Sequence, residues 1–123
     1  MTGFESQITF ICTGDLESST RFYGDLLGLP LVMDQGSCMI FRAAPGAFIG
    51  VCRREGTVPP EGVILTLVTT DVEGWYRRLM DAGVEFEKAP TFNPDYDITH
   101  CFCRDPAGCL VEIQHFEDPR WKG

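Results

Sequence analysis

Residues 7–28 read QITFICTGDLESSTRFYGDLLG, and this stretch predicts a strand that runs directly into a helix. β-branched and aromatic residues occur at strand density up to Asp15, which is the expected N-cap of the helix. Gly28 supplies the left-handed conformation that ends it. The helix has an apolar face that is expected to pack on a sheet, formed by Leu16, Phe22, Tyr23, Leu26 and Leu27.

Three short strands are expected to follow this helix. They are Leu31–Asp34, Ser37–Ala43 and Ala47–Arg53, separated by turns at Gln35-Gly36 and Pro45-Gly46. A polar, proline-containing linker over residues 55–62 then separates them from the rest of the chain. The first half of the sequence is therefore predicted to be one β-α-β-β-β unit.

The same order of elements starts again after the linker. VILTLVTT (63–70) predicts a strand and DVEGWYRRLMDAG (71–83) an amphipathic helix, opened by a capping box between Thr70 and Glu73 and closed by Gly83. The three strands expected to follow it are Val84–Glu87, Asp97–Arg104 and Cys109–Phe116. One such unit is too small to bury both faces of its sheet, so two units are expected to act together.

The fold class predicted from this repeat is α+β. Two βαβββ modules, approximately residues 4–54 and 62–118, would form a single domain over residues 1–123. We expect a curved eight-stranded sheet with a concave cleft on one face and both helices on the convex face.

Composition excludes several kinds of partner. A net charge of −8 opposes binding to nucleic acid and to anionic membranes, and there is no apolar run long enough to span a bilayer. The beginning of the sequence lacks the pattern of a secretory signal, so a cytoplasmic protein is expected. The six cysteines lie in apolar, strand-like runs without a C-x-x-C pair, and we predict that all six are free thiols.

Two segments resemble one known family. GDLESSTRFYGDLLGLPL (14–31) is similar to the first helix, and DPAGCLVEIQHF (105–116) to the closing hairpin, of the vicinal oxygen chelate superfamily, which includes glyoxalase I, bleomycin-resistance proteins and extradiol dioxygenases. The resemblance covers nearly the whole chain. It implies a cleft that holds a divalent metal such as zinc, nickel, manganese or iron, although the metal can also be absent.

The resemblance assigns the metal ligands unevenly. Glu112 matches the carboxylate of the closing hairpin. The family spacing before the first helix lands on Ile8, with Gln7 one residue away, and before the second helix on Leu65, which is no ligand. Glu112 and Gln7 are thus the candidate metal ligands, and Gln7 needs a bulge to reach the cleft face.

His100 is the second candidate catalytic residue. If Gly108 forms a left-handed bulge, Phe102 lies opposite Glu112 and His100 opposite Gln114, so that all four share the cleft face. His100 and Glu112 could then act as an acid and base pair. Without the bulge, cysteines take these places, and His100 could also be a structural residue.

A ligand pocket is the other prediction for the cleft. Its candidate residues are Phe10, Phe41, Phe48, Phe102, Gln114 and Tyr96, although phenylalanines at strand alternation are also typical of a core. KAPTFNPDYD (88–97) is expected to be a loop, either a lid or specificity loop or a plain surface connection.

Three functions remain open at this point. The first is a glyoxalase-like lyase or isomerase with a degenerate metal site. The second is a metal-independent protein that binds an antibiotic or aromatic compound, as bleomycin-resistance proteins do, and the third is an extradiol dioxygenase. In each case the partner is a small molecule, and the resemblance implies a homodimer.

Overall fold

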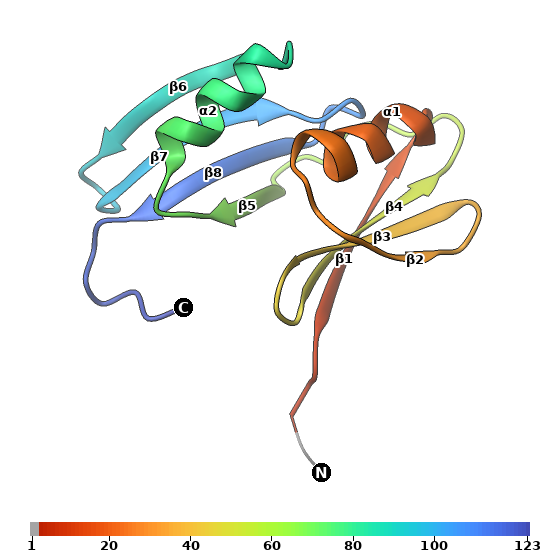
Figure 1. Cartoon of the computed structure of the whole chain (residues 1–123), viewed down its shortest axis with the longest axis horizontal. Coiled ribbons are helices and arrows are strands. Elements are labelled where there is room, and N and C mark those ends of the chain that lie inside the picture. The colour runs from red at the N-terminus through yellow and green to blue at the C-terminus, as the bar shows by residue number, and fades with distance from the viewer. Residues whose placement is uncertain (1–2) are drawn as a thin grey trace. The chain divides into compact units, whose positions relative to one another are not determined.

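A computed structural model describes residues 3–123 and contains two four-stranded sheets, each accompanied by a helical segment (Figure 1). Hydrogen bonds join strands within each module, and the chain divides into two compact units. The first unit consists of the chain up to Pro59 with residues 106–108, and the second of residues 60–105 and 109–123. The α+β class with two βαβββ modules is confirmed.

The first unit begins with β1 (Gln7–Thr13) and continues with β2 (Leu31–Asp34), β3 (Cys38–Ala44) and β4 (Ala47–Arg53). The strand order is β1-β4-β3-β2, with β1 parallel to β4 and the other pairs antiparallel. Ile11 and Val51 are buried on the side of the sheet that carries the helix. The bounds of β2, β3 and β4 agree with the prediction to within one residue.

The first helix is partly π-helical. α1 (Leu16–Thr20) runs into η1 (Arg21–Leu26), where the Leu27 N–H donates to the Phe22 carbonyl at 2.9 Å. The wider turn allows the neighbours Phe22 and Tyr23 both to be buried. Asp15 is the N-cap, as predicted, and accepts from the Ser18 amide at 3.1 Å.

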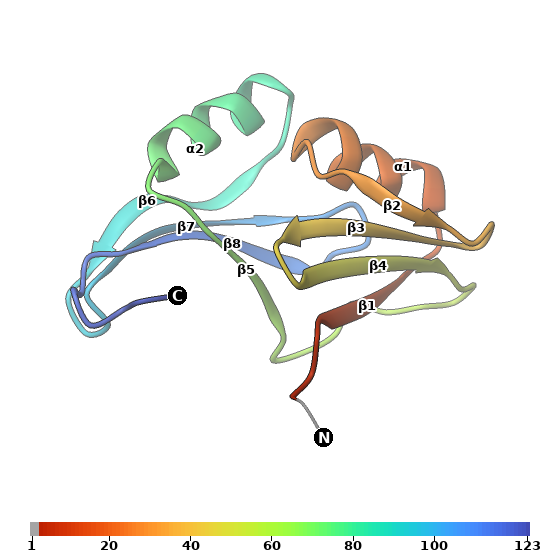
Figure 2. The ribbon, with the colours of Figure 1, turned by 60° about the horizontal axis from the view of Figure 1, so that its bottom comes forward.

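The second unit repeats this plan with β5 (Ile64–Val68), α2 (Val72–Asp81), β6 (Phe86–Asn93), β7 (Ile98–Arg104) and β8 (Leu110–Phe116). Its order is β5-β8-β7-β6, with β5 parallel to β8. Each helix lies over one face of its own sheet (Figure 2). Among the described residues, no helix has the length and apolar character needed to cross a membrane.

The predicted capping box of α2 is wrong. Asp71, not Thr70, is the N-cap, and its carboxylate accepts from the Gly74 amide at 2.9 Å. An ionised carboxylate is a stronger acceptor for the free amides of a first turn than a hydroxyl is. Asp71 thus repeats in the second unit what Asp15 does in the first.

The segment 88–97 is also not the loop that we predicted. β6 extends to Asn93, and only a short turn remains before β7. Two register shifts between β6 and β7, at Phe86/Lys88 and Lys88/Thr91, accommodate Pro90 within the strand. Lys88 therefore belongs to the sheet.

Not all six cysteines are free. Cys38 and Cys52 form a disulfide between β3 and β4, where they are direct cross-strand partners with a Cα–Cα distance of 4.1 Å. The sequence separation of 14 gave no hint of this pairing, because it depends on the register of the hairpin. Cys12, Cys101, Cys103 and Cys109 are not part of a disulfide.

Candidate active site

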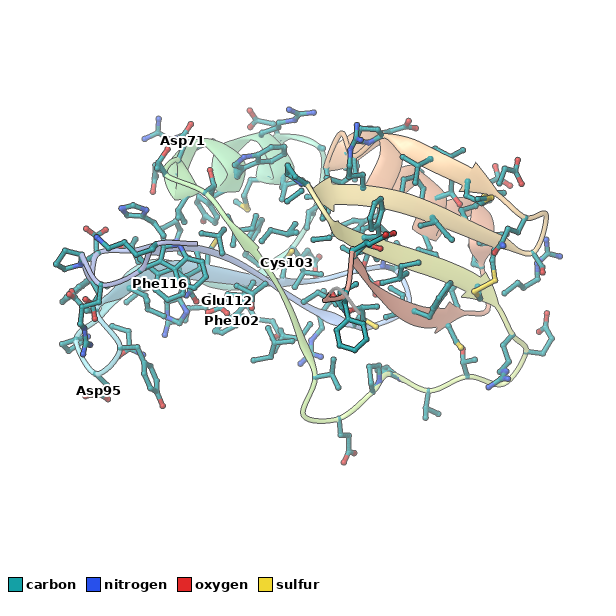
Figure 3. The ribbon with its side chains drawn as sticks, turned by 90° about the horizontal axis from the view of Figure 1, so that it is seen from below. Asp71, Asp95, Phe102, Cys103, Glu112 and Phe116 are labelled. Atoms are coloured by element: carbon teal, nitrogen blue, oxygen red, sulfur yellow. A yellow bond between two sulfur atoms is a disulfide. The ribbon has the colours of Figure 1, made fainter. Side chains whose placement is uncertain are left out.

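The hairpin of β7 and β8 brings the predicted polar residues onto one face. His100 pairs with Gln114 and Phe102 with Glu112, as expected from a bulge at Gly108. The φ of Gly108 is 89°, and the Asp105 amide donates to the Cys109 carbonyl at 2.9 Å. Glu112 and Phe102 lie together on the side of the ribbon away from α2 (Figure 3). The predicted register is confirmed.

Cys101 and Cys103 alternate onto the opposite face and are fully buried toward α2. Burial raises the pKa of the Cys101 thiol to about 11 and that of Cys103 to about 12, because the thiolate loses its hydration. Both therefore stay protonated and unreactive near neutral pH. The alternative that cysteines replace His100 and Phe102 on the polar face is excluded.

The centre of the site is a hydrogen bond of 2.6 Å between His100 Nδ1 and Glu112 Oε2. Both residues are buried, with 4% and 7% of their surface exposed. Lys88 Nζ lies 3.3 Å from His100 Nε2. Because an ammonium group can only donate, Nε2 accepts and Nδ1 carries the ring hydrogen that is donated to Glu112.

The same carboxylate receives further donors. Thr66 of β5 donates from Oγ1 to Glu112 Oε1 at 2.8 Å, which follows from the parallel register of Thr66 and Glu112. Gln114 turns its amide nitrogen to the carboxylate, at 2.9 Å from Oε2 and 3.1 Å from Oε1. Three neighbouring side chains therefore fix the position of the Glu112 carboxyl group.

These residues do not fit a divalent metal. Gln7 alternates with Ile8 in a strand whose register to β4 has no bulge, so Gln7 faces away from the side of Ile8, and its amide donates to Thr9. Each oxygen of Glu112 accepts a hydrogen bond and keeps a further lone pair, so a metal here would lack other protein ligands rather than this one. Within residues 3–123, no group of three or more His, Cys, Asp or Glu side chains is placed to hold a metal. The prediction of Gln7 as a ligand is not supported, and we derive no step through a metal.

Two residues of the site were missed in the sequence. Lys88 was placed in a loop, whereas β6 brings its amine to His100. Thr66 follows Leu65, the position at which the family spacing finds no metal ligand, and the alternation of β5 with its pairing to β8 brings it to Glu112. Pairing the two strands from their sequences would have identified Thr66, but nothing in the sequence shows the bulges that position Lys88.

Tyr96 belongs to a second feature of this unit. With Phe116 and Trp121 it lines an open cavity of about 290 Å³, whose remaining walls are Asp118 and Arg120. The rings of Phe116 and Trp121 stack at 4.2 Å, and Tyr96 is 72% exposed. Hydrogen bonds from Arg120 lower the pKa of Asp118 to about 2, so the rim carries an ionised carboxylate.

The aromatic residues of the first unit do not all share one face. Ile8 pairs with Phe48, and the ring of Phe10 lies over Gly50, where any side chain would collide with it. Phe41 is buried on the other side, beside Tyr23 and Gly24. Phe41 is therefore a core residue, and we do not retain it as a pocket residue.

Sequence and structure comparisons agree on one family. Residues 6–113 match the Glyoxalase/Bleomycin resistance protein/Dioxygenase superfamily, so the chain belongs to this superfamily. No curated protein matches the chain significantly in sequence.

Solved structures show the same fold at low sequence identity. A glyoxalase/bleomycin resistance protein/dioxygenase from Nocardioides is 23% identical, with a TM-score of 0.72 over 100% of this chain and 89% of the other. Lactoylglutathione lyase from Agrobacterium tumefaciens is 19% identical, with a TM-score of 0.73 over 93% and 95%. TioX from Micromonospora sp. ML1 is 17% identical, with a TM-score of 0.74 over 89% and 97%.

Proposed function

We propose that this chain is a small-molecule isomerase or lyase in which Glu112 transfers a proton and His100 orients it. The observation that carries the proposal is the buried 2.6 Å contact between His100 Nδ1 and Glu112 Oε2, within a network in which Thr66 also donates to the carboxylate. A glyoxalase-like activity is the nearest reaction class, because the superfamily includes lyases such as the lactoylglutathione lyase to which the fold is similar.

The proposed reaction is a proton shift next to a carbonyl group. Glu112 takes the proton from the carbon atom that carries the hydroxyl group of an α-hydroxy ketone, and the protonated carboxyl returns it to the former carbonyl carbon. The hydroxyl proton moves to the former carbonyl oxygen by way of the enediol, so the carbonyl and hydroxyl groups exchange places. His100 donates to Glu112 throughout and orients the carboxylate, while Lys88 keeps the histidine in the required tautomer. No atom is gained or lost in an isomerisation of this kind.

The cost of burying these groups favours a function over a role in stability alone. Replacing a buried charged network by apolar side chains of similar volume is often neutral or stabilising. Apolar neighbours already surround the strand, since Val111 and Ile113 flank Glu112 on the other face. A charged network at this position is therefore expected to be used in chemistry.

Deuterium exchange tests the proposal without knowledge of the physiological substrate. The protein is incubated in D₂O with lactoylglutathione or with simple α-hydroxy ketones, in EDTA and again with added zinc, nickel, manganese or ferrous iron. Proton NMR then follows exchange at the α carbon. We expect exchange in EDTA, and a loss of roughly 100-fold or more in Glu112→Gln, which keeps the shape but removes the base.

Thr9→Val is the matched control, because Thr9 is a half-buried strand residue of the other unit whose hydroxyl accepts from Gln7. Exchange that persists in Glu112→Gln would rule out this residue as the base. Exchange seen only with an added metal would contradict the metal-independent mechanism.

The cavity at Tyr96 supports a second candidate function, the binding of an aromatic or cationic compound. Stacked Phe116 and Trp121 offer an aromatic surface to a flat ligand, while the ionised Asp118 beside them is held by Arg120 at 2.6 Å. This is the kind of ligand that bleomycin-resistance proteins sequester.

Calorimetric titration with a planar aromatic cation such as ethidium, and with bleomycin, tests this second function. Trp121→Ala should weaken binding by about 1 kcal/mol or more, since it removes one face of the stack. Trp75→Ala is the control, because Trp75 lies on α2 with Arg78 over its ring. Equal losses in both variants, or no binding by the unchanged protein, would contradict a ligand site at this cavity.

A further inference from the structure

Three cysteines of the first unit lie in one row across its sheet. Cys12 of β1 is in register with Cys52 of β4, and Cys52 is in register with Cys38 of β3. Residues directly opposite in neighbouring strands project to the same face of a sheet. The three sulfur atoms therefore share one face, with Cys52 in the middle.

The row contains both a disulfide and a thiol. Cys38 and Cys52 are bonded, and Cys12 is free and exposed. Figure 3 draws the disulfide as a yellow bond. Exchange requires only that a thiolate approaches one sulfur of a disulfide, so this row holds both reactants.

Strand spacing determines which pairs can form. Neighbouring strands lie about 4.8 Å apart, within the Cα separation of about 4.4–6.8 Å that disulfides usually span. Cys52 therefore has a partner on each side. Cys12 and Cys38 are separated by two strand spacings, roughly 9–10 Å, which is too far for a bond without backbone movement.

We propose that Cys12, Cys38 and Cys52 form a thiol–disulfide exchange site. The Cys12 thiol releases its proton to water, and the thiolate attacks Sγ of Cys52. The Cys12–Cys52 bond forms, the Cys38–Cys52 bond breaks, and Cys38 leaves as a thiolate that takes a proton from water. One disulfide is exchanged for another, so no oxidant or reductant is consumed.

The reaction partners of this site are low-molecular-weight thiols and their disulfides. Once the bond has moved to Cys12, one of its sulfurs belongs to the exposed residue of the row. An external thiolate can then attack Sγ of Cys12, giving a mixed disulfide there and releasing Cys52 as a thiolate. A second external thiolate then attacks the external sulfur of this mixed disulfide. The two external thiols leave as one disulfide, and Cys12 is released as a thiolate that takes a proton from water.

Tryptic mapping tests the exchange directly, because trypsin separates the three cysteines. Cleavage after Arg21, Arg42 and Arg53 places Cys12 in peptide 1–21, Cys38 in peptide 22–42 and Cys52 in peptide 43–53. The folded protein is equilibrated with reduced and oxidised glutathione at mildly alkaline pH, quenched with acid and alkylated. Mass spectrometry of the non-reduced digest then identifies the linked peptides.

We expect two linked pairs from the folded protein, 22–42 with 43–53 and 1–21 with 43–53. The pair 1–21 with 22–42 should appear only after exchange in urea, where the sheet no longer sets the distances. Cys38→Ser should form the 1–21 with 43–53 pair quantitatively, and Cys12→Ser should lose it and be reduced more slowly by glutathione.

Circular dichroism of both serine variants establishes that they are folded. A folded Cys38→Ser protein that forms no Cys12–Cys52 bond would overturn the proposal. So would the pair 1–21 with 22–42 at the same abundance as the other two in the folded protein, because the row would then not determine the pairing.

Discussion

At Glu112 a carboxylate occupies a buried strand position and is held by His100, Thr66 and Gln114. Glu112→Leu alone should lower the free energy of unfolding by about 3–5 kcal/mol, because it leaves these donors buried without their acceptor. The double variant His100→Phe with Glu112→Leu should recover most of that loss, since the two new side chains are apolar.

Urea denaturation of the two variants and of the unchanged protein measures the difference. If the double variant were less stable than Glu112→Leu, the network would be required for stability rather than for chemistry. Activity should be lost in both variants, so the two properties separate.

The free thiols differ in reactivity by their burial. Cys12 should react with iodoacetamide in the folded protein near neutral pH, whereas Cys101 and Cys103 should react only on unfolding, because burial raises the pKa of each thiol. Peptide mapping after a short alkylation measures this. Rapid labelling of Cys103 before Cys12 would contradict the burial of the β7 face toward α2.

The raised pKa values also give a direction for alkaline stability. The folded state favours the protonated thiols of Cys101 and Cys103. Their contribution to the free energy of unfolding is complete below the unfolded pKa of 9.0, and it is lost as the pH rises toward the folded pKa values of about 11 and about 12. The free energy of unfolding should fall over this window. Cys103→Ala should make the decline shallower.

At the scale of elements, the N-cap of α2 gives a prediction with a built-in control. Asp71→Ala should lower the free energy of unfolding by about 1 kcal/mol, because the Gly74 amide loses its acceptor. Thr70→Ala should have little effect, since Thr70 is exposed and precedes the N-cap. Chemical denaturation of both variants distinguishes this cap from a capping box at Thr70.

The elements also show how far the sequence determines the structure. The strands of the first unit and the face of His100 followed from alternation and from the left-handed glycine at residue 108. The length of β6 and the Cys38–Cys52 bond did not, because each depends on cross-strand register. Lys88 was missed because the length of β6 was underestimated. The prediction that Gln7 is a metal ligand required a bulge in β1, and β1 pairs with β4 without one.

At the scale of the whole molecule, β2 supports the expected homodimer. It is the edge strand of its sheet, and its apolar residues Leu31, Val32 and Met33 are all exposed. An unpaired apolar edge is a surface on which a second copy can add a strand. We therefore expect a dimer by light scattering after gel filtration, and a monomer for Val32→Lys.

Val58→Lys is the control for that substitution, because Val58 is an exposed apolar residue outside the strands. By light scattering, Val58→Lys should form the same dimer as the unchanged protein. A monomeric unchanged protein, or a dimer that survives Val32→Lys, would contradict pairing through β2.

The two tryptophans have a consequence for spectroscopy. Trp75 and Trp121 both belong to the second unit, and the first unit contains none within the described residues. Emission excited at the red edge of the absorption band therefore originates only from the second unit. The first unit contributes no emission under these conditions. A tryptophan placed there, for example Phe48→Trp, in a protein whose Trp75 and Trp121 are replaced by Phe, would report the unfolding of the first unit alone.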